Sequence, residues 1–437
     1  MKYFSLPIAV IFICLGITAT FPQDFDELRF AGSGIDVDAE GRVLPLSKEK
    51  SEALGKMMEE LLKKEPIPEG LDRKVTLRKI SLKKLDAQVK RIVDQYEFLP
   101  DAIRYLGGLT SIDYIVAVPE ENDLLLIGPA EGWRHDPTGN IVGKQSGQPV
   151  LVLEDFVTAL REWNRQTPPP AITCSIEPTQ ETLTKLAQLH RQYTSINANN
   201  ADAYSAALEE AYGECPITIT GMPESSRFVK VLVGADFKMK RIALGLEPSQ
   251  VRSLPSYVSM ISVSQPNISP QFLLFPEYAT MSHDSKKLTW RIGDIKVRAS
   301  SRMTGGTDRA ALTWCRSLEE NYDVLAKAQP VFGELRNNMK LVLAAALIHQ
   351  EKLLQKADCR LTILLDESKL KLVEQPVPKR VSYRSITSKN GYSTIVACGG
   401  VEINPSGALR NNQRLDSKMD SERARLIKTT GDEWWSP

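Results

Sequence analysis

Apolar residues recur every three or four positions in several segments of the chain, and this spacing predicts amphipathic helices. In residues 82–96 one face gathers six apolar side chains, namely Leu82, Leu85, Val89, Ile92, Val93 and Tyr96. The same spacing predicts further helices over 47–64, 154–163, 201–212, 227–244, 308–327 and 331–355. The last of these contains the apolar run 341–348, which is too short to span a membrane and indicates a buried helix.

Short apolar or alternating segments bounded by turn residues predict strands elsewhere in the chain. Segments 112–118 and 124–127 flank the polar turn 119–123 and predict a hairpin. Segments 288–292 and 295–299 alternate strictly around Gly293-Asp294, a two-residue turn that predicts the best-defined hairpin of the chain. Shorter strands are expected at 150–153, 174–176, 217–219, 381–384, 392–396 and 401–403.

These elements predict an α+β fold of two or three small mixed domains with short strands, hairpins and amphipathic helices. Because Thr167 is followed by three prolines, the first boundary is expected there, between an N-terminal α+β domain at 25–166 and a central α+β domain at 171–304. A C-terminal segment of helices and strands is expected at 305–408. Residues 409–437 are polar and charged, which predicts a disordered tail.

Composition supports a folded protein of more than one domain. The 437 residues carry 55 Lys+Arg and 54 Asp+Glu, a formal net charge of +1, and 42% are hydrophobic. This length exceeds the roughly 250–300 residues that one hydrophobic core supports. Since nucleic-acid binding needs a marked excess of basic residues, the charge argues against a nucleic-acid partner. It also provides no basic face for anionic lipid.

The N-terminus has the order of a secretory signal peptide, assigned to residues 1–20. A basic start, Met1-Lys2, precedes the apolar run 4–16 and the small residues 18–20. The run is shorter than the roughly 20 residues that cross a bilayer, so no integral span is expected after cleavage. The sequence therefore predicts a secreted or periplasmic protein. An uncleaved membrane anchor is the alternative.

The cysteine pattern favours neither a metal site nor a redox motif. Five cysteines follow the signal segment, an odd number, at positions Cys174, Cys215, Cys315, Cys359 and Cys398. Cys174 and Cys398 are the candidates for one disulfide, although a chain of this size folds without one. The sequence contains no CxxC and no HExxH, and its four histidines are scattered. We therefore expect no metal and no cofactor.

The candidate site residues come from the segment 128–136, which leaves a strand and contains glycines, an aromatic residue and ionisable groups. Glu131 and Asp136 are candidate acid/base groups, and Trp133 and Arg134 are candidate binding residues. The favoured alternative is a tight turn anchored by a buried Trp133. Asp236 is a further candidate carboxylate, although an ion pair with Lys240 four residues later also explains it.

Six ordered phrases together resemble one family. They are Ile35-Asp36-Val37-Asp38-Ala39-x-Gly41, Gly128-Pro129-Ala130-Glu131-Gly132-Trp133, Cys174-Ser175-Ile176-x-Pro178-Thr179, Ala235-Asp236-Phe237-x-Met239-Lys240, Leu254-Pro255-Ser256-Tyr257 and Gly399-Gly400-Val401. The chain resembles, over about residues 30–405, the uncharacterised exported bacterial family common in planctomycetes that is the domain of unknown function numbered 1598. The resemblance implies export and brings no catalytic residues with it.

Two functions remain open at this point. The preferred one is a binding or structural module of the cell envelope or periplasm, whose partner is an unknown protein or envelope component. The alternative is an exported hydrolase acting on an envelope or extracellular polymer, with Glu131 and Asp136, or Asp236, as its carboxylates. Such an enzyme needs two carboxylates facing each other across a cleft.

The signal peptide predicts a specific N-terminus for the native protein. Because cleavage follows the small residues after the apolar run, mass spectrometry should find a new N-terminus between Ala19 and Asp24. An intact Met1 on a membrane-bound protein would contradict the prediction and favour the anchor.

Overall fold

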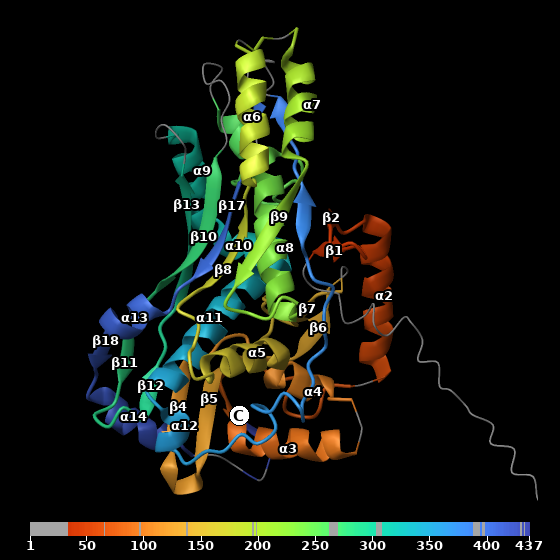
Figure 1. Ribbon diagram of the computed structural model, residues 1–437. Coiled ribbons are helices and arrows are strands. Elements are labelled where there is room, and N and C mark those ends of the chain that lie inside the picture. Colours follow the sequence, from red (N-terminus) through yellow and green to blue (C-terminus); the bar gives the residue numbers. More distant parts are fainter. Residues whose placement is uncertain are drawn as a thin grey trace, which may run out of the picture.

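The computed structural model describes most of the chain after the signal segment. The described residues are 34–64, 66–95, 98–136, 139–194, 196–197, 199–261, 270–302, 308–387, 394–395, 398–428, 431 and 433–437. Two large mixed sheets and the helices around them confirm the α+β fold class (Figure 1). None of the helices in these residues is both long enough and apolar enough to cross a bilayer.

The first sheet has seven strands in the order β18-β11-β12-β4-β5-β3-β19. Their bounds are β3 Val75–Ser81, β4 Tyr114–Val118, β5 Asp123–Ala130, β11 Met281–His283, β12 Thr289–Arg291, β18 Gln413–Leu415 and β19 Trp435–Ser436. The hairpin expected at 112–127 is confirmed, because β4 and β5 pair antiparallel with Val118 opposite Asp123. Helix α3, Leu82–Asp94, packs on this sheet, and the hydroxyl of Ser81 caps it.

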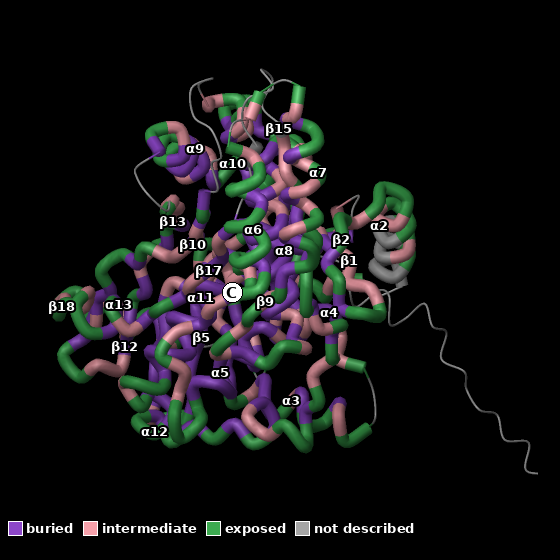
Figure 2. The backbone as a smooth tube through the Cα atoms, turned by 45° about the horizontal axis from the view of Figure 1, so that its top comes forward, coloured by how far each residue is buried: buried purple, intermediate pink, exposed green. Residues whose placement is uncertain are grey.

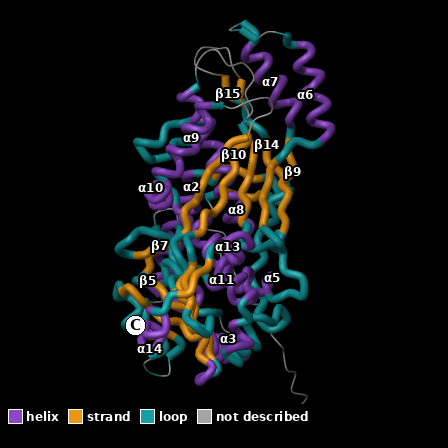
Figure 3. The backbone as a smooth tube through the Cα atoms, turned by 90° about the vertical axis from the view of Figure 1, so that its left-hand side faces the viewer, coloured by secondary structure: helices purple, strands orange, loops and turns teal. Residues whose placement is uncertain are grey.

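The second sheet has six strands in the order β13-β10-β17-β8-β9-β14. Their bounds are β8 Ile172–Ile176, β9 Glu214–Thr220, β10 Gln271–Tyr278, β13 Ile295–Arg302, β14 Arg380–Ser382 and β17 Cys398–Ile403. Figure 3 shows it beside the first sheet, with helices α6, Gln180–Gln192, and α7, Ala201–Tyr212, projecting beyond it as an arm. Helix α8, Arg227–Leu244, packs against β17 and β8.

The chain has further elements outside the two large sheets. They are β1 Ile35–Val37, β2 Val43–Pro45, α2 Lys48–Lys64, α4 Asp101–Arg104, η1 Leu106–Gly108, η2 Pro119–Glu121, β6 Trp133–His135, β7 Ile141–Gly143, η3 Tyr257–Met260, α9 Arg309–Glu320, α12 Leu353–Lys356, β15 Ile386–Thr387, β16 Thr394–Ile395, α13 Ser406–Asn411 and α14 Lys418–Leu426. Strands β1 and β2 form a hairpin, as do β6 and β7.

Helix α11, Pro330–Gln350, lies in the centre of the molecule, in the region that Figure 2 shows as buried. It packs against α5, Leu153–Trp163, against α8, and against α10, Tyr322–Ala328. The apolar run 341–348 lies entirely inside it and every residue of that run is buried, which confirms the predicted buried helix. This helix therefore connects the helices that cover the two sheets.

One buried guanidinium joins three of these helices. Arg227, the first residue of α8, forms ion pairs with Asp155 of α5 and Glu334 of α11. The exposed fractions of the three side chains are 13%, 3% and 5%. Burial, only partly offset by the charge of Arg227, raises the pKa of Glu334 to about 7. The three charges therefore depend on one another, because none of them is well solvated by water.

The hairpin expected at 288–299 is wrong, because its two strands belong to different sheets. Strand β12 pairs with β4 and β11, whereas β13 pairs with β10. The backbone N–H of Ile292 donates to Asp113 in the first sheet, and the carbonyl of Asp294 accepts from Ala279 at the end of β10. The Gly293-Asp294 segment thus carries the chain from one sheet to the other. Alternation identifies the strands here but not their partners.

The disordered tail expected at 409–437 is also wrong for the residues described. Strand β18 pairs with β11, and β19 pairs with β3, so the two segments extend the seven-stranded sheet at both edges. Helix α14 buries Met419 and Leu426 in a cluster with strands β4 and β5. The tail attaches to the sheet through a few apolar residues and through backbone hydrogen bonds. Its other residues are polar, so its composition alone does not reveal that it is ordered.

The sheets also interleave the predicted domains. The seven-stranded sheet takes strands from 25–166, from 171–304 and from the tail, while the six-stranded sheet takes strands from 171–304 and 305–408. One cluster of buried apolar residues extends from Ile35 to Trp434 across both sheets. The predicted boundaries therefore do not coincide with the sheets.

Strand β10 contains Pro276, a residue that argues against a central strand in the sequence. Proline lacks the N–H that a central strand normally donates. Pro276 is opposite Val297 of β13, at a position where the two backbones do not bond each other, and the pairing of β10 with β17 ends at Leu274. The sheet therefore loses no backbone hydrogen bond through this proline.

Removal of the central cation should strongly destabilise the fold. Arg227→Met leaves the carboxylates of Asp155 and Glu334 buried without it, so we expect a loss of about 3–5 kcal/mol in the free energy of unfolding. Urea denaturation of the full chain measures this loss. The matched control is Arg360→Met, because the Arg360 side chain is 84% exposed; it should change stability by less than about 0.5 kcal/mol. Equal midpoints for the two variants would contradict the structural role of Arg227.

Candidate functional site

The structure gives Glu131 a local structural task. Its side chain is buried, and its carboxylate accepts the backbone N–H groups of Gln145 at 2.7 Å and Ser146 at 3.2 Å. Trp133 is also buried and packs edge-on against Tyr105, with ring centroids 5.8 Å apart. The segment is therefore a tight turn with a buried tryptophan, in which Glu131 fixes the chain that follows β7.

The other candidate residues each make local interactions and do not form one site together. Asp136 accepts the backbone N–H of Asn140 at 2.8 Å and its amide nitrogen at 2.9 Å, within the β6–β7 hairpin. Arg134 is exposed. Asp236 is fully buried in α8 and pairs with Lys240 at 2.6 Å. Burial, against the opposing charge of Lys240, raises the pKa of Asp236.

The five cysteines after the signal segment are all buried free thiols, so the candidate pair Cys174 and Cys398 forms no disulfide. Cys174 of β8 is opposite Val401 of β17 in the six-stranded sheet. Cys398 therefore lies three residues away along the strand, about 10 Å. A disulfide needs Cα atoms within roughly 7 Å, so this register excludes the bond.

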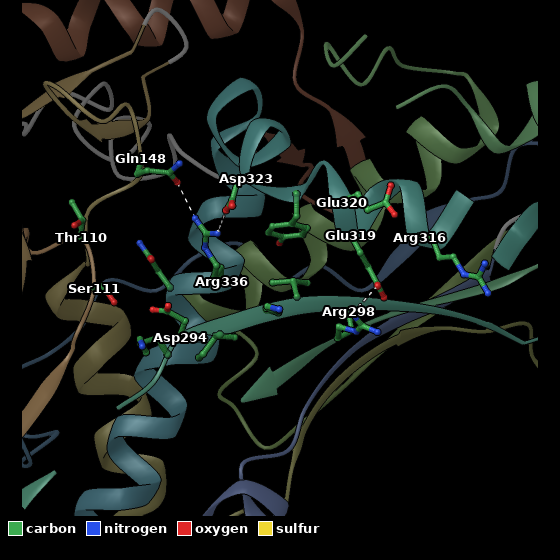
Figure 4. Close-up of a pocket in the computed structure, with 16 residues that line it drawn as sticks. Thr110, Ser111, Gln148, Asp294, Arg298, Arg316, Glu319, Glu320, Asp323 and Arg336 are labelled. Atoms are coloured by element: carbon green, nitrogen blue, oxygen red, sulfur yellow. Dashed lines mark hydrogen bonds and ion pairs between the residues drawn. The ribbon is translucent and has the colours of Figure 1, made fainter. Parts of the chain in front are cut away.

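A cleft of about 840 Å³ lies elsewhere, between β13 and the helices α9, α10 and α11. We call it the β13 cleft (Figure 4). None of Glu131, Trp133, Arg134, Asp136 and Asp236 lines it. Its cationic lining residues are Lys296, Arg298, Arg316, Arg336 and Lys340. Its acidic lining residues are Asp294, Glu319, Glu320 and Asp323.

Ion pairs hold part of this charged lining in place. Arg298 contacts Glu319 at 3.0 Å, and Glu319 also accepts the backbone N–H of Ala299 at 2.8 Å. Arg336 pairs with Asp323 and donates to Gln148 at 3.0 Å. Both arginines are thus oriented before any ligand arrives, which lowers the entropy lost on binding.

Other charged groups of the cleft are available to a ligand. Lys296, Arg316 and Glu320 are exposed, and within the described residues none of them forms an ion pair. In Figure 4, Arg316 lies at the end of the cleft beyond Arg298, and Asp294 lies at the opposite end. The cleft therefore presents uncommitted charges of both signs.

Lys340 is the one buried cation of the lining. Its amine donates to the carbonyl of Gly293 at 2.7 Å, just before β13. Burial lowers the pKa of Lys340 to about 8; Asp113 and Asp294 oppose this shift and Arg336 adds to it. At neutral pH the residue therefore places a positive charge with little hydration beside the start of β13.

The lining carries groups for recognition more clearly than for catalysis. Within the part of the chain that is described, no group of three or more His, Cys, Asp or Glu side chains could hold a metal ion. Two of the acidic lining residues, Glu319 and Asp323, are already engaged by arginines. The arrangement can bind a polar ligand through charges of both signs.

Sequence reasoning missed this site because no local motif marks it. Its residues come from the loop at 110–111, from Gln148, from β13 and from three separate helices. The one local signal is the alternation of Lys296 and Arg298 with apolar residues in β13. That alternation led to the hairpin prediction, which placed the strand in the wrong surroundings.

Comparison with known proteins finds one family. Residues 174–257 match the family described as "Protein of unknown function (DUF1598)". The match runs from Cys174 in β8 to Tyr257 at the start of η3, which confirms the resemblance over that segment. No curated protein and no solved structure matches the chain. The residues that line the β13 cleft lie outside the matched segment.

The buried amine of Lys340 predicts a pH dependence of stability. Its pKa is about 8 in the folded chain against an ordinary 10.5, so between these values the unfolded chain binds more protons and stability rises with pH. Lys340→Met should remove about 1–3 kcal/mol of this rise between about pH 7.5 and pH 9.5. Urea midpoints at the two pH values give the difference.

The control for this measurement is Lys185→Met, since the Lys185 side chain is 54% exposed. It should keep the wild-type pH dependence between about pH 7.5 and about pH 9.5, because its ion-pair partner Glu181 is a carboxylate whose pKa, lowered by Lys185, lies far below this range. Identical pH dependences for wild type and Lys340→Met would show that the amine is not buried as described.

Proposed function

We propose that this protein is an exported binding module of the cell envelope, and that the β13 cleft holds a peptide segment of its partner. The observation that carries the proposal is a cleft of about 840 Å³ lined by charges of both signs, some fixed by ion pairs and others uncommitted. This volume lies within the roughly 300–1,000 Å³ of typical ligand sites.

The charge pattern supports a peptide over other ligands. Five cationic residues against four acidic ones give little net charge in the lining. Nucleic acids and anionic polymers bind through an excess of cations, and apolar ligands bind to apolar walls. A peptide offers side chains of both signs together with backbone donors and acceptors, so it can satisfy such a lining.

The hydrolase alternative lacks comparable support. It requires two carboxylates across a cleft, separated by about 5–9.5 Å. Glu131 and Asp136 hold backbone and amide groups of their own turn, and Asp236 is fully buried beside Lys240. The remaining carboxylates of the β13 cleft, Asp294 and Glu320, lie towards opposite ends of it (Figure 4), a placement that does not favour a facing pair.

The free cysteines are compatible with the proposed export. Burial raises the pKa of Cys215, Cys315 and Cys359 to about 12. Because the thiolate is the reactive form, such thiols resist oxidation and disulfide exchange. An exported protein with these cysteines can remain reduced in an oxidising compartment without an internal bridge.

A display library of random dodecapeptides tests the proposal on the immobilised full chain. We expect enriched sequences that contain acidic and basic residues, and a synthetic representative should bind in titration calorimetry. Arg316→Glu reverses an exposed, uncommitted charge of the cleft and should weaken this peptide about tenfold.

The matched control is Arg360→Glu, because Arg360 is exposed and lies outside the cleft. This variant should bind the peptide like wild type. Failure to enrich any peptide would overturn the proposed function. Equal weakening by both substitutions would place the binding site outside the β13 cleft and would also overturn it.

A further inference from the structure

One long side of the β13 cleft is the edge of a sheet. Strand β13 stands at the end of the six-stranded sheet, and among the described residues β10 is the strand that pairs with it. Residues 295–298 of β13 line the cleft. An open strand edge presents a row of backbone groups that another chain can pair with.

The hydrogen-bond register shows which backbone groups face the cleft. The N–H of Ala299 points away from β10 and donates to the side chain of Glu319. The pairing of β13 with β10 is continuous from Arg302 to Ile295, without a bulge. Because backbone groups in a strand alternate in direction with a period of two residues, Val297 and Ile295 also turn their N–H and C=O groups away from β10.

The cleft reaches β13 between Ile295 and Arg298. Helix α9 packs along β13, and Glu319 near its end uses the outward N–H of Ala299. Ile295 and Val297 are buried as whole residues, with exposed fractions of 7% and 4%. Both nevertheless line the cleft, and the register turns their backbone N–H and C=O groups away from β10. Two residues thus offer up to four backbone hydrogen bonds to an extended chain.

The charges along the edge indicate which side chains this chain should carry. Lys296 is an exposed residue of β13 that lines the cleft, and Arg316 lies at the end of the cleft beyond Arg298 (Figure 4). Arg298 is already engaged by Glu319 and Glu277. The uncommitted charges beside the strand are therefore two cations, Lys296 and Arg316, and one carboxylate, Glu320. The two cations match an acidic residue of a peptide.

We propose that the β13 cleft binds its peptide by strand addition, with the peptide backbone paired to Ile295 and Val297 and an acidic side chain directed towards Arg316. This proposal rests on the proposed function and specifies the binding mode of the same site. Recognition through backbone groups supplies affinity for many sequences, and the flanking charges select among them.

An N-methyl scan of the peptide selected from the display library tests the pairing. In an added strand, alternate residues direct their N–H groups towards β13, so N-methylation at these positions should weaken binding about tenfold or more. Methylation at the intervening positions should be tolerated, and these peptides serve as the matched controls. Uniform tolerance along the peptide would overturn strand addition.

Amide exchange observed by NMR on the full chain gives an independent readout. Saturating peptide should slow exchange at the amides of Ile295 and Val297, while Lys296 and Arg298, which already face β10, should change little. A peptide that binds through the cleft without this alternating protection overturns strand addition and leaves the proposed function standing. If no peptide binds at all, both proposals fall.

Discussion

The ion pairs of Arg227 are the constraint on which the rest of the structure depends. The residue starts α8, and its guanidinium reaches Asp155 of α5 and Glu334 of α11. Removal of three charges from water costs free energy, and their mutual attraction offsets this cost. The three helices are therefore held in the arrangement that brings the charges together. Helix α11 carries Arg336 and Lys340 within two turns after Glu334. The same interaction therefore orients one wall of the β13 cleft.

The cleft forms where the chain passes between the two sheets. Strand β12 ends in the first sheet and β13 begins in the second, so the start of β13 lies next to the loop at 110–111 and to α11. Lys340 supports this crossing by donating to the Gly293 carbonyl. A hairpin at this position would have paired β13 with β12. Because the chain crosses instead, one edge of β13 stays open to the cleft.

The local elements were largely predictable from the sequence, but their partners were not. The bounds of the helices at 201–212 and 227–244 agree with the prediction, because periodicity and the glycine that ends α8 are local signals; Gly245 has φ 72°. The tail and the 288–299 segment failed because their structure depends on sheet edges distant in sequence. The cleft was missed for the same reason, and Glu131 was chosen because its neighbours in sequence, not in space, resembled a site.

The most direct measurement is a crystal structure of the full chain with a peptide selected from the display library. Our account predicts an extended peptide beside β13, with backbone N···O distances of about 2.9 Å to Ile295 and Val297. It also predicts an acidic peptide side chain near Arg316. A peptide seated on the α6–α7 arm, or elsewhere outside the cleft, would contradict the account.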